Sequence, residues 1–467
     1  MLGFAIAGYM LINLGIGLWA SRFVKNTKDF VLAGQKLPLV LAASATFATW
    51  FGAESILGAP AEFLKHGVQG VIEDPFGAAL CLFLVGLFFA RHFYRLGILT
   101  FCDYFRHRYG KRAEIWSALL IVPSYISWIA AQLLAMGTVM KIVLGWPTAE
   151  SMIVSTALVV TYTIWGGMWS ISLTDFFQTI LIIGGLAIVG GAMYVKTGGI
   201  APLAKNMPDG FFDFFPKSNL MDWSKYIAAW ITIGLGSIPQ QDVFQRVMSA
   251  RDAGTSVKAC LLSAVMYLSV ALIPLYIALC ARFLYPDSQP DGQMMIPDMV
   301  MRHMSLPVQV LFLGALLSAI LSTTSSAIMA PATVIGENIY RFFKPATTDR
   351  ELLKVIRLGI VGIAFVAVIM ASGRESIFEL VAESSAFSLV TLFVPLTAGL
   401  YWKKATLSGC LLSMALGLGT WLSCVMMETD FPALLFGLTA AVLGMAAGSY
   451  ASGFSEKDLR KNSREGL

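Results

Sequence analysis

The sequence predicts an all-α integral membrane protein, and three observations support that class. First, 57% of its 467 residues are hydrophobic and only 13% are charged, which excludes an ordinary soluble domain. Second, about thirteen apolar segments, each long enough to cross a bilayer, fill the chain almost end to end. Third, two of these segments are interrupted at corresponding places, which is typical of an inverted repeat built around a binding site.

The predicted membrane segments are separated by short polar stretches. Their bounds are 2–21, 39–60, 73–95, 115–143, 149–169, 173–196, 224–246, 255–283, 306–337, 354–372, 375–402, 405–426 and 431–451. The first segment begins at once, with no basic stretch before it and no cleavage site. We therefore expect a membrane anchor rather than a signal peptide.

The basic residues indicate how the chain crosses the membrane. If the N-terminus lies outside, most of the 33 Lys and Arg residues fall in inside loops: 22–36, 91–112, 246–258, 341–357, 403–404 and the tail from Lys457. The positive-inside rule then predicts the N-terminus outside and the C-terminus inside. The net charge of +5 therefore reflects topology, and we expect no nucleic-acid partner.

The two interrupted segments are the first and sixth of a ten-helix block. Small and polar residues interrupt one of them at Thr46–Glu54 and the other at Gly234–Asp242. Non-helical backbone is tolerated in a membrane only where protein or a wet cavity surrounds it. The two breaks therefore predict the substrate site of a secondary transporter.

A run of five hydroxyl residues, Ser322 to Ser326, lies in a late apolar segment. Ala319, Ser322 and Thr323 have the spacing of one helix face. Sodium is a hard cation that prefers oxygen ligands, so this run predicts half of a sodium site, completed by carbonyls freed at the first break. The alternative is that the hydroxyls serve close helix packing or bond their own helix's carbonyls.

Other chemistry is not indicated. The six cysteines are isolated, without a C-x-x-C pair, and the four histidines lie far apart, so we expect no metal cluster. No nucleophile–base pair is evident, and an enzyme is the least favoured class. We expect no cofactor other than a coupling ion.

Several motifs together resemble the sodium/solute symporters, the family of sodium-coupled galactose, proline, sialic acid and choline carriers. These motifs are Lys28–Gly34, Gly166-Gly167-Met168-Trp169, Thr174-Asp175-Phe176-Phe177-Gln178, Ser322–Ser326 and Glu337-Asn338-Ile339-Tyr340. The resemblance covers nearly the whole chain, and the choline-carrier branch is the most similar.

The resemblance implies a leucine-transporter-type core of two inverted five-helix repeats. The implied regions are an extra helix and cytoplasmic loop at 1–38, the first repeat at 39–196, an outer loop at 197–223, the second repeat at 224–402, and two further helices with a cytoplasmic tail at 403–467.

The resemblance also implies two ion sites. The first uses the carbonyls of Ala48, Phe51 and Ala319 with the hydroxyls of Ser322 and Thr323. Some members bind a second sodium near an aspartate, and Asp175 with Ser322, Ser325 and Ser326 matches that pattern. The alternative for Asp175 is an N-cap after the Gly-Gly turn.

The substrate residues follow from similar comparisons. Trp50 and Trp128 resemble cage residues of the choline carriers, which hold a quaternary ammonium by cation–π attraction. Gln240, beside Gln241, replaces an expected tryptophan, and Val381 stands where another aromatic is expected. The alternative for both tryptophans is helix packing or an interfacial position.

Five acids lie toward the outer halves of helices: Glu54, Glu73, Asp74, Glu379 and Glu383. By alignment with the galactose carrier, Glu73, Glu379 and Glu383 border the substrate pocket. If the acids line a vestibule, they favour a cationic solute; otherwise they are solvated at the interface. We further expect Asp242 and Arg246, spaced i, i+4, to form an ion pair near the cytoplasmic rim.

The leading function is sodium-driven uptake of a small polar organic solute across a bacterial-type inner membrane. One alternative is proton coupling through Asp175 or a vestibule glutamate, and another is a transporter-like sensor or channel. The hydroxyl run favours sodium, because protons do not need it. The expected partners are the solute, Na⁺ and lipid, with no obligatory protein partner.

Overall fold

The computed structural model describes residues 2–217, 219–285 and 292–452, and within these ranges the chain is helical. Its extended backbone pairs there at one isolated bridge, between Leu37 and Ala250. The α-helices are α1 (Leu2–Ala20), α2 (Thr27–Leu32), α3 (Leu39–Trp50), α4 (Ala59–His66), α5 (Ala78–Leu84), α6 (Ala90–Leu96), α7 (Phe101–Tyr109), α8 (Lys111–Leu144), α9 (Thr148–Thr197), α10 (Ile200–Ala204), α11 (Leu220–Gly236), α12 (Gln241–Ser249), α13 (Ala253–Leu284), α14 (Met295–His303), α15 (Leu306–Val334), α16 (Arg341–Phe343), α17 (Asp349–Ala371), α18 (Ile377–Ser388), α19 (Val394–Tyr401), α20 (Leu407–Met426) and α21 (Ala433–Ala451). The all-α prediction is confirmed.

Polar residues in the loops fix where many helices begin. A side-chain oxygen accepts a hydrogen bond from a backbone N–H of the first turn at Asn26, Thr100, Asn219, Asp252, Thr348, Ser376 and Thr406. Such caps satisfy backbone donors that have no partner inside the helix. The cap at Thr100 is reciprocal, because Asp103 also bonds the Thr100 N–H.

Both predicted helix breaks are present. Helix α3 ends at Trp50, and the chain is non-helical at Phe51 and Gly52 before the π-helical segment η3 (Glu54–Gly58). Helix α11 ends at Gly236, and α12 begins at Gln241. The backbone groups released at both breaks are buried in protein, as non-helical backbone in a membrane requires.

Helix α9 is interrupted at Gly167, near the end of the predicted segment 149–169 and before the predicted segment 173–196. Gly167 has φ 50° and ψ −145°, a conformation that residues with a Cβ rarely adopt. A Cβ at this position would also lie 2.5 Å from the carbonyl oxygen of Phe30. Only glycine therefore fits the turn that redirects the chain here.

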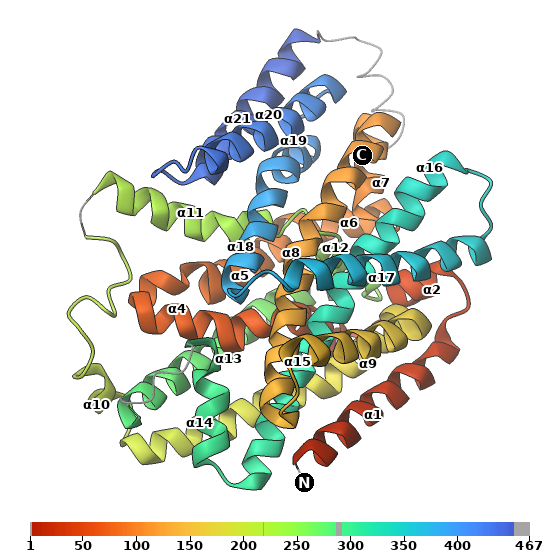
Figure 1. The fold of residues 1–467 in the computed structure, drawn as a ribbon. Helices are drawn as coiled ribbons and strands as arrows, with labels where there is room; N and C mark the ends of the chain where they lie inside the picture. Colours follow the sequence, from red (N-terminus) through yellow and green to blue (C-terminus); the bar gives the residue numbers. More distant parts are fainter. Residues whose placement is uncertain (1, 218, 286–291, 453–467) are drawn as a thin grey trace.

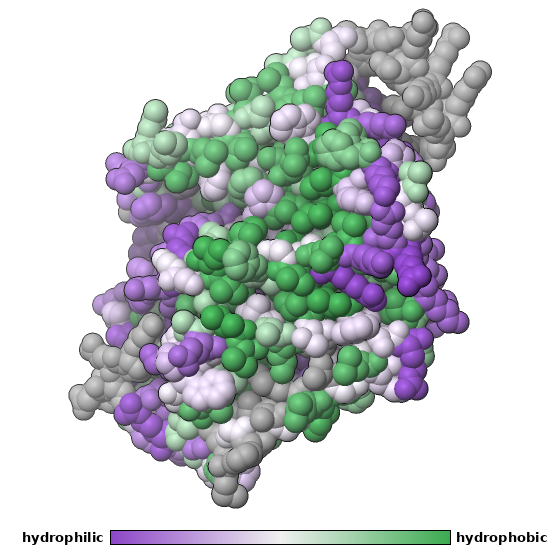
Figure 2. All heavy atoms as spheres, turned by 45° about the vertical axis from the view of Figure 1, so that its right-hand side comes forward, coloured by the Kyte–Doolittle hydropathy of each residue, from purple (hydrophilic) through white to green (hydrophobic). Residues whose placement is uncertain are grey.

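Nine helices in the described residues are long and apolar enough to cross a membrane, and 39–50 and 148–161 form shorter apolar helices. Figure 2 shows a face whose middle is covered by apolar side chains, with hydrophilic ones gathered at two opposite margins. Exposed residues such as Val265, Phe365 and Leu443 suit a lipid-facing surface. The count of thirteen spans and the orientation of the termini stay predictions.

The helices that hold the two breaks lie near the middle of the bundle. Helix α3 packs against α9, α13 and α15, and α12 packs against α3 and α15. Helix α1 lies at one margin, along α9 and α15, whereas α20 and α21 form a pair at the opposite margin (Figure 1). The central helices therefore bring residues from distant parts of the sequence to one site.

Candidate functional site

The hydroxyl run of α15 meets the end of α3. Ser322 Oγ and Thr323 Oγ1 each lie 3.2 Å from the carbonyl oxygen of Ala48, to which they can donate. All three residues are buried. Three oxygens from two helices thus converge, as a hard cation requires. Phe51 directly follows the last residue of α3 and Ala319 lies one turn before Thr323, but the ligand role of their carbonyls stays a prediction.

The other hydroxyls of the run have different partners. Thr324 Oγ1 donates to the Ile320 carbonyl and Ser325 Oγ to the Ser322 carbonyl, both within α15. Ser326 Oγ accepts a hydrogen bond from Arg246. The back-bonding alternative therefore describes Thr324 and Ser325, whereas Ser322, Thr323 and Ser326 contact other helices.

Asp175 lies beside this run, on the inner surface of α9. Its carboxylate accepts a hydrogen bond from Ser322 Oγ and forms an ion pair with Arg246, with 3.3 Å between Oδ2 and Nη2. Asp175 is 0% exposed and Arg246 3%. Because Asp175 lies inside the helix rather than at its start, the N-cap alternative is wrong.

Arg246 corrects a further expectation. Its guanidinium bonds Asp175, Ser326 and Thr49 Oγ1, the last at 2.6 Å, and not Asp242. Asp242 instead accepts hydrogen bonds from Tyr125 OH and from Trp50 Nε1, the latter at 3.0 Å. Both residues are buried, so the expected Asp242–Arg246 pair at the cytoplasmic rim is wrong. Side chains of α3, α8, α9 and α15 supply these partners, so each charged group of α12 is paired outside its own helix.

A cavity lies next to the break of α3, among residues of α3, α8, α11, α13 and α18. Its lining residues are Trp50, Glu54, Asp74, Ala78, Trp128, Ile233, Ser237, Gln240, Tyr267, Val381, Ser384 and Ser385. Among the described residues that line it, none is basic. Trp50, Trp128 and Gln240 thus lie together, and their role in substrate binding stays a prediction.

Two carboxylates dominate the polarity of this cavity. Glu54 and Asp74 are only 5% and 1% exposed. Gln132 Nε2 donates to Glu54 Oε2 at 2.6 Å. Tyr267 OH and Ser55 Oγ contact the Asp74 carboxylate at 2.7 and 3.0 Å. Each acid therefore has neutral hydrogen-bond partners.

Another lining group, Ser384 Oγ, is buried without a hydrogen-bond partner in the structure, whereas Trp128 Nε1 lies near the Glu54 carboxylate. Buried polar groups normally have partners, so each such group calls for an explanation. The cavity has a volume of only about 20 Å³ in this conformation, so a polar solute would supply that partner only once the cavity widened.

Four of the expected substrate residues do not line the cavity. Glu73 lies beside Asp74, and its Oε2 is buried without a partner. Gln241 Oε1 accepts a hydrogen bond from the Phe101 N–H at 2.6 Å and thus faces α7. Glu379 is exposed in the first turn of α18, and Glu383 pairs with Arg374.

Asp74 and Glu54 are the acids that line the cavity, in place of Glu73, Glu379 and Glu383. Asp74 has extended backbone, with φ −140° and ψ 118°, inside the π-helical segment η5 (Ile72–Gly77). That local extension aims Asp74 and not Glu73 at the cavity, and helix periodicity does not reveal it. Glu54 had a usable signal, because it directly follows the break of α3.

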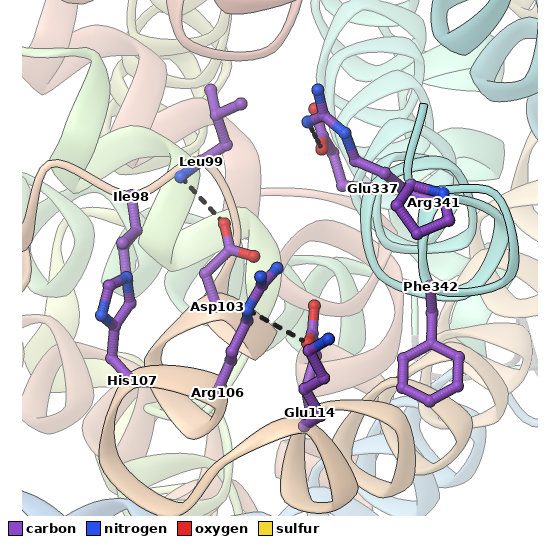
Figure 3. Close-up of a pocket in the computed structure, with 11 residues that line it drawn as sticks. Ile98, Leu99, Asp103, Arg106, His107, Glu114, Glu337, Arg341 and Phe342 are labelled. Carbon is purple, nitrogen blue, oxygen red and sulfur yellow. Dashed lines mark hydrogen bonds and ion pairs between the residues drawn. The ribbon is translucent and has the colours of Figure 1, made fainter. Parts of the chain in front are cut away.

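A second cavity, about 550 Å³ in volume, lies among segments predicted to be cytoplasmic (Figure 3). Asn338, in the π-helical segment η8 (Ile335–Tyr340), is buried beneath it. Its Nδ2 donates to Asp103 Oδ1 at 2.9 Å and to Glu114 Oε1 at 3.1 Å, and its Oδ1 accepts from Thr100 Oγ1 at 2.7 Å. One side chain thus joins η8 to α7 and α8.

Comparison with known proteins identifies this arrangement. The family model described as the sodium:solute symporter family matches residues 30–417. The chain belongs to the sodium:solute symporter family. This is a family of transporters and not of enzymes.

Relatives within the family differ in what they transport. The chain is 27% identical over 446 residues to the high-affinity choline transporter 1 of Caenorhabditis elegans, covering 89% of this chain and 76% of that protein. It is 23% identical to the sodium/pantothenate symporter of Haemophilus influenzae, covering 94% and 95%. Choline is a cation and pantothenate an anion, so family membership does not identify the solute.

The fold also matches a solved structure. A Na⁺-coupled sialic acid symporter, in a substrate-bound outward-open state, aligns with a TM-score of 0.85 over 97% of this chain and 98% of that chain. Its sequence is 18% identical, so the match concerns the fold alone. The family match itself supports sodium-coupled symport.

Proposed function

We propose that this symporter uses a sodium gradient to import a small organic cation by alternating access. The observation behind the solute class is the cavity lined by Glu54, Asp74, Trp50 and Trp128, without a basic residue among its described lining. A buried charge is costly unless it is paired, and a cationic solute would pair these carboxylates. The indole faces would add cation–π attraction.

We propose that the first sodium ion binds where the Ala48 carbonyl meets Ser322 and Thr323, with the carbonyls of Phe51 and Ala319 completing the shell. A second ion would use Asp175, Ser325 and Ser326. Because the Arg246 guanidinium already contacts Asp175 and Ser326, that ion would bind only if Arg246 moved aside. We therefore favour a single coupling ion.

The proposed ion and solute sites share the end of α3. Ala48 belongs to the ion site and Trp50 to the solute cavity. A Cβ added to Gly52 would lie 2.8 Å from both Thr323 Oγ1 and Gln132 Oε1, so groups of the two sites flank the same glycine. Binding at either site would order the same backbone, which gives a physical route for coupling.

Proton coupling is a second candidate, because the cavity contains two buried carboxylates. If Glu54 or Asp74 carried a proton, only one unpaired charge would remain when a neutral solute bound. A pH gradient would then drive uptake without sodium.

We propose that the chain crosses a bacterial-type inner membrane thirteen times, with inverted repeats at 39–196 and 224–402.

The test is solute uptake into proteoliposomes with and without an inward sodium gradient. We expect uptake of a small organic cation to require sodium. Trp50→Leu should weaken uptake about two- to thirty-fold, the range expected for cation–π attraction. Trp116→Leu, a change at an exposed residue of α8, is the control. Sodium-dependent uptake of an anion alone, insensitive to Trp50→Leu, would contradict the proposal.

Asn338→Ala should favour the inward-open state. It removes the hydrogen bonds that join η8 to α7 and α8, and water can replace them only when that end opens. Hydrogen bonds to charged groups contribute about 1.5–3 kcal/mol, so we expect roughly tenfold faster labelling of an Ile98→Cys reporter by an impermeant maleimide. Asn206→Ala, in the outer loop, is the control, and an unchanged labelling rate would exclude this latch.

A further inference from the structure

The pair of carboxylates in the solute cavity has a consequence for solute chemistry. Glu54 belongs to η3 and Asp74 to η5, and both line the same cavity. Their partners, Gln132, Tyr267 and Ser55, are neutral hydrogen-bond donors. These donors satisfy some lone pairs but cancel no charge.

A carboxylate has about four acceptor positions, so each acid retains room for another donor. A donor that is itself charged makes a shorter and stronger hydrogen bond than a neutral one. The group that best completes this site therefore carries both a positive charge and N–H bonds.

We propose that the cavity selects primary or secondary amines over quaternary ammonium compounds, through hydrogen bonds from the amine to Glu54 and Asp74. The inference rests on the proposed import of an organic cation and specifies its class. A quaternary ammonium has the charge but no N–H, so it would leave both buried carboxylates without a charged donor.

The aromatic residues do not oppose this selection. Trp50 is held by its hydrogen bond to Asp242, and Tyr267 by its bond to Asp74, so their polar edges are already occupied. Gln240 and Val381 line the cavity with an amide and an aliphatic side chain. The faces of Trp50, Tyr267 and Trp128 stay available to any ammonium group, so cation–π attraction acts on methylated and unmethylated amines alike and does not set the preference.

A further lining group suggests a second feature of the solute. Ser384 Oγ is buried without a hydrogen-bond partner and can both donate and accept. An oxygen atom on the solute would satisfy it. An amine that also carries a hydroxyl or carbonyl oxygen combines both features.

Four compounds test the proposal directly: ethanolamine, N-methylethanolamine, N,N-dimethylethanolamine and choline. At neutral pH each carries one positive charge and one hydroxyl, while the number of N–H bonds falls from three to none. The affinity for each compound is measured as the concentration that gives half-maximal sodium-dependent uptake into proteoliposomes. We expect ethanolamine to bind at least about tenfold more tightly than choline, as the loss of a charge-assisted hydrogen bond implies.

The variants Glu54→Gln and Asp74→Asn should reduce that preference, because an amide offers fewer acceptors and no charge. Glu62→Gln, on the outer face of α4, should leave it unchanged, since Glu62 does not line the cavity. The order of affinities for the four compounds in the wild-type protein is informative even if a variant fails to fold.

Affinity that is constant or rises with methylation would overturn the selection for N–H donors while leaving cation import intact. Failure of all four compounds, together with sodium-dependent uptake of a neutral or anionic solute, would overturn the proposed function as well.

Discussion

Asp175→Asn should lower the free energy of unfolding by about 3–5 kcal/mol, the typical result of removing one partner of a buried ion pair. The Arg246 guanidinium would keep its bonds to Ser326 and Thr49 but lose its counter-charge in a fully buried position. The measurement is thermal or denaturant unfolding of the purified protein in detergent. Asp209→Asn, at an exposed position of the predicted outer loop, is the matched control.

A double variant separates the ion pair from other roles of Asp175. In Asp175→Asn with Arg246→Gln, no buried charge remains unpaired, so part of the lost stability should return. If Asp175→Asn alone were as stable as the wild type, the pair would contribute little. If both variants lost sodium coupling while the double variant regained stability, Asp175 would also serve the ion.

The helices and their two breaks were predictable from the sequence. Apolar length defines a membrane helix, and small residues such as Gly52 and Gly236 mark places where the helix stops. The Gly166-Gly167 pair was an equally clear signal in the sequence. The structure gives the reason, because Gly167 has positive φ and leaves no space for a Cβ. These features depend on neighbouring residues in the chain.

The pairing of charges was not predictable in the same way. The spacing of Asp242 and Arg246 suggested one ion pair, yet Arg246 pairs with Asp175 on α9. Likewise, Glu73 and Asp74 are adjacent, and the extended backbone of Asp74 determines which of them lines the cavity. Such choices depend on how distant helices pack, and one sequence does not encode that in a local pattern.

Ser322→Ala and Thr323→Ala should each raise the sodium concentration for half-maximal uptake by at least about tenfold. Loss of an outer-shell partner of a metal ligand commonly costs 10–100-fold in affinity, and loss of a ligand itself should cost no less. Each change removes one hydroxyl near the Ala48 carbonyl and leaves a residue that fits a helix well. Uptake is measured over a range of sodium concentrations at fixed solute.

Ser269→Ala and Thr161→Ala are matched controls, because their hydroxyls bond their own helices at exposed positions. Unchanged sodium dependence in both Ser322→Ala and Thr323→Ala would exclude the proposed ion site.

The two variants should also differ from each other. Ser322 Oγ bonds both Asp175 and Ala48, whereas Thr323 Oγ1 bonds Ala48 but not Asp175. Ser322→Ala should therefore also weaken the Asp175–Arg246 region and lower thermal stability, and Thr323→Ala should change sodium affinity with little effect on unfolding.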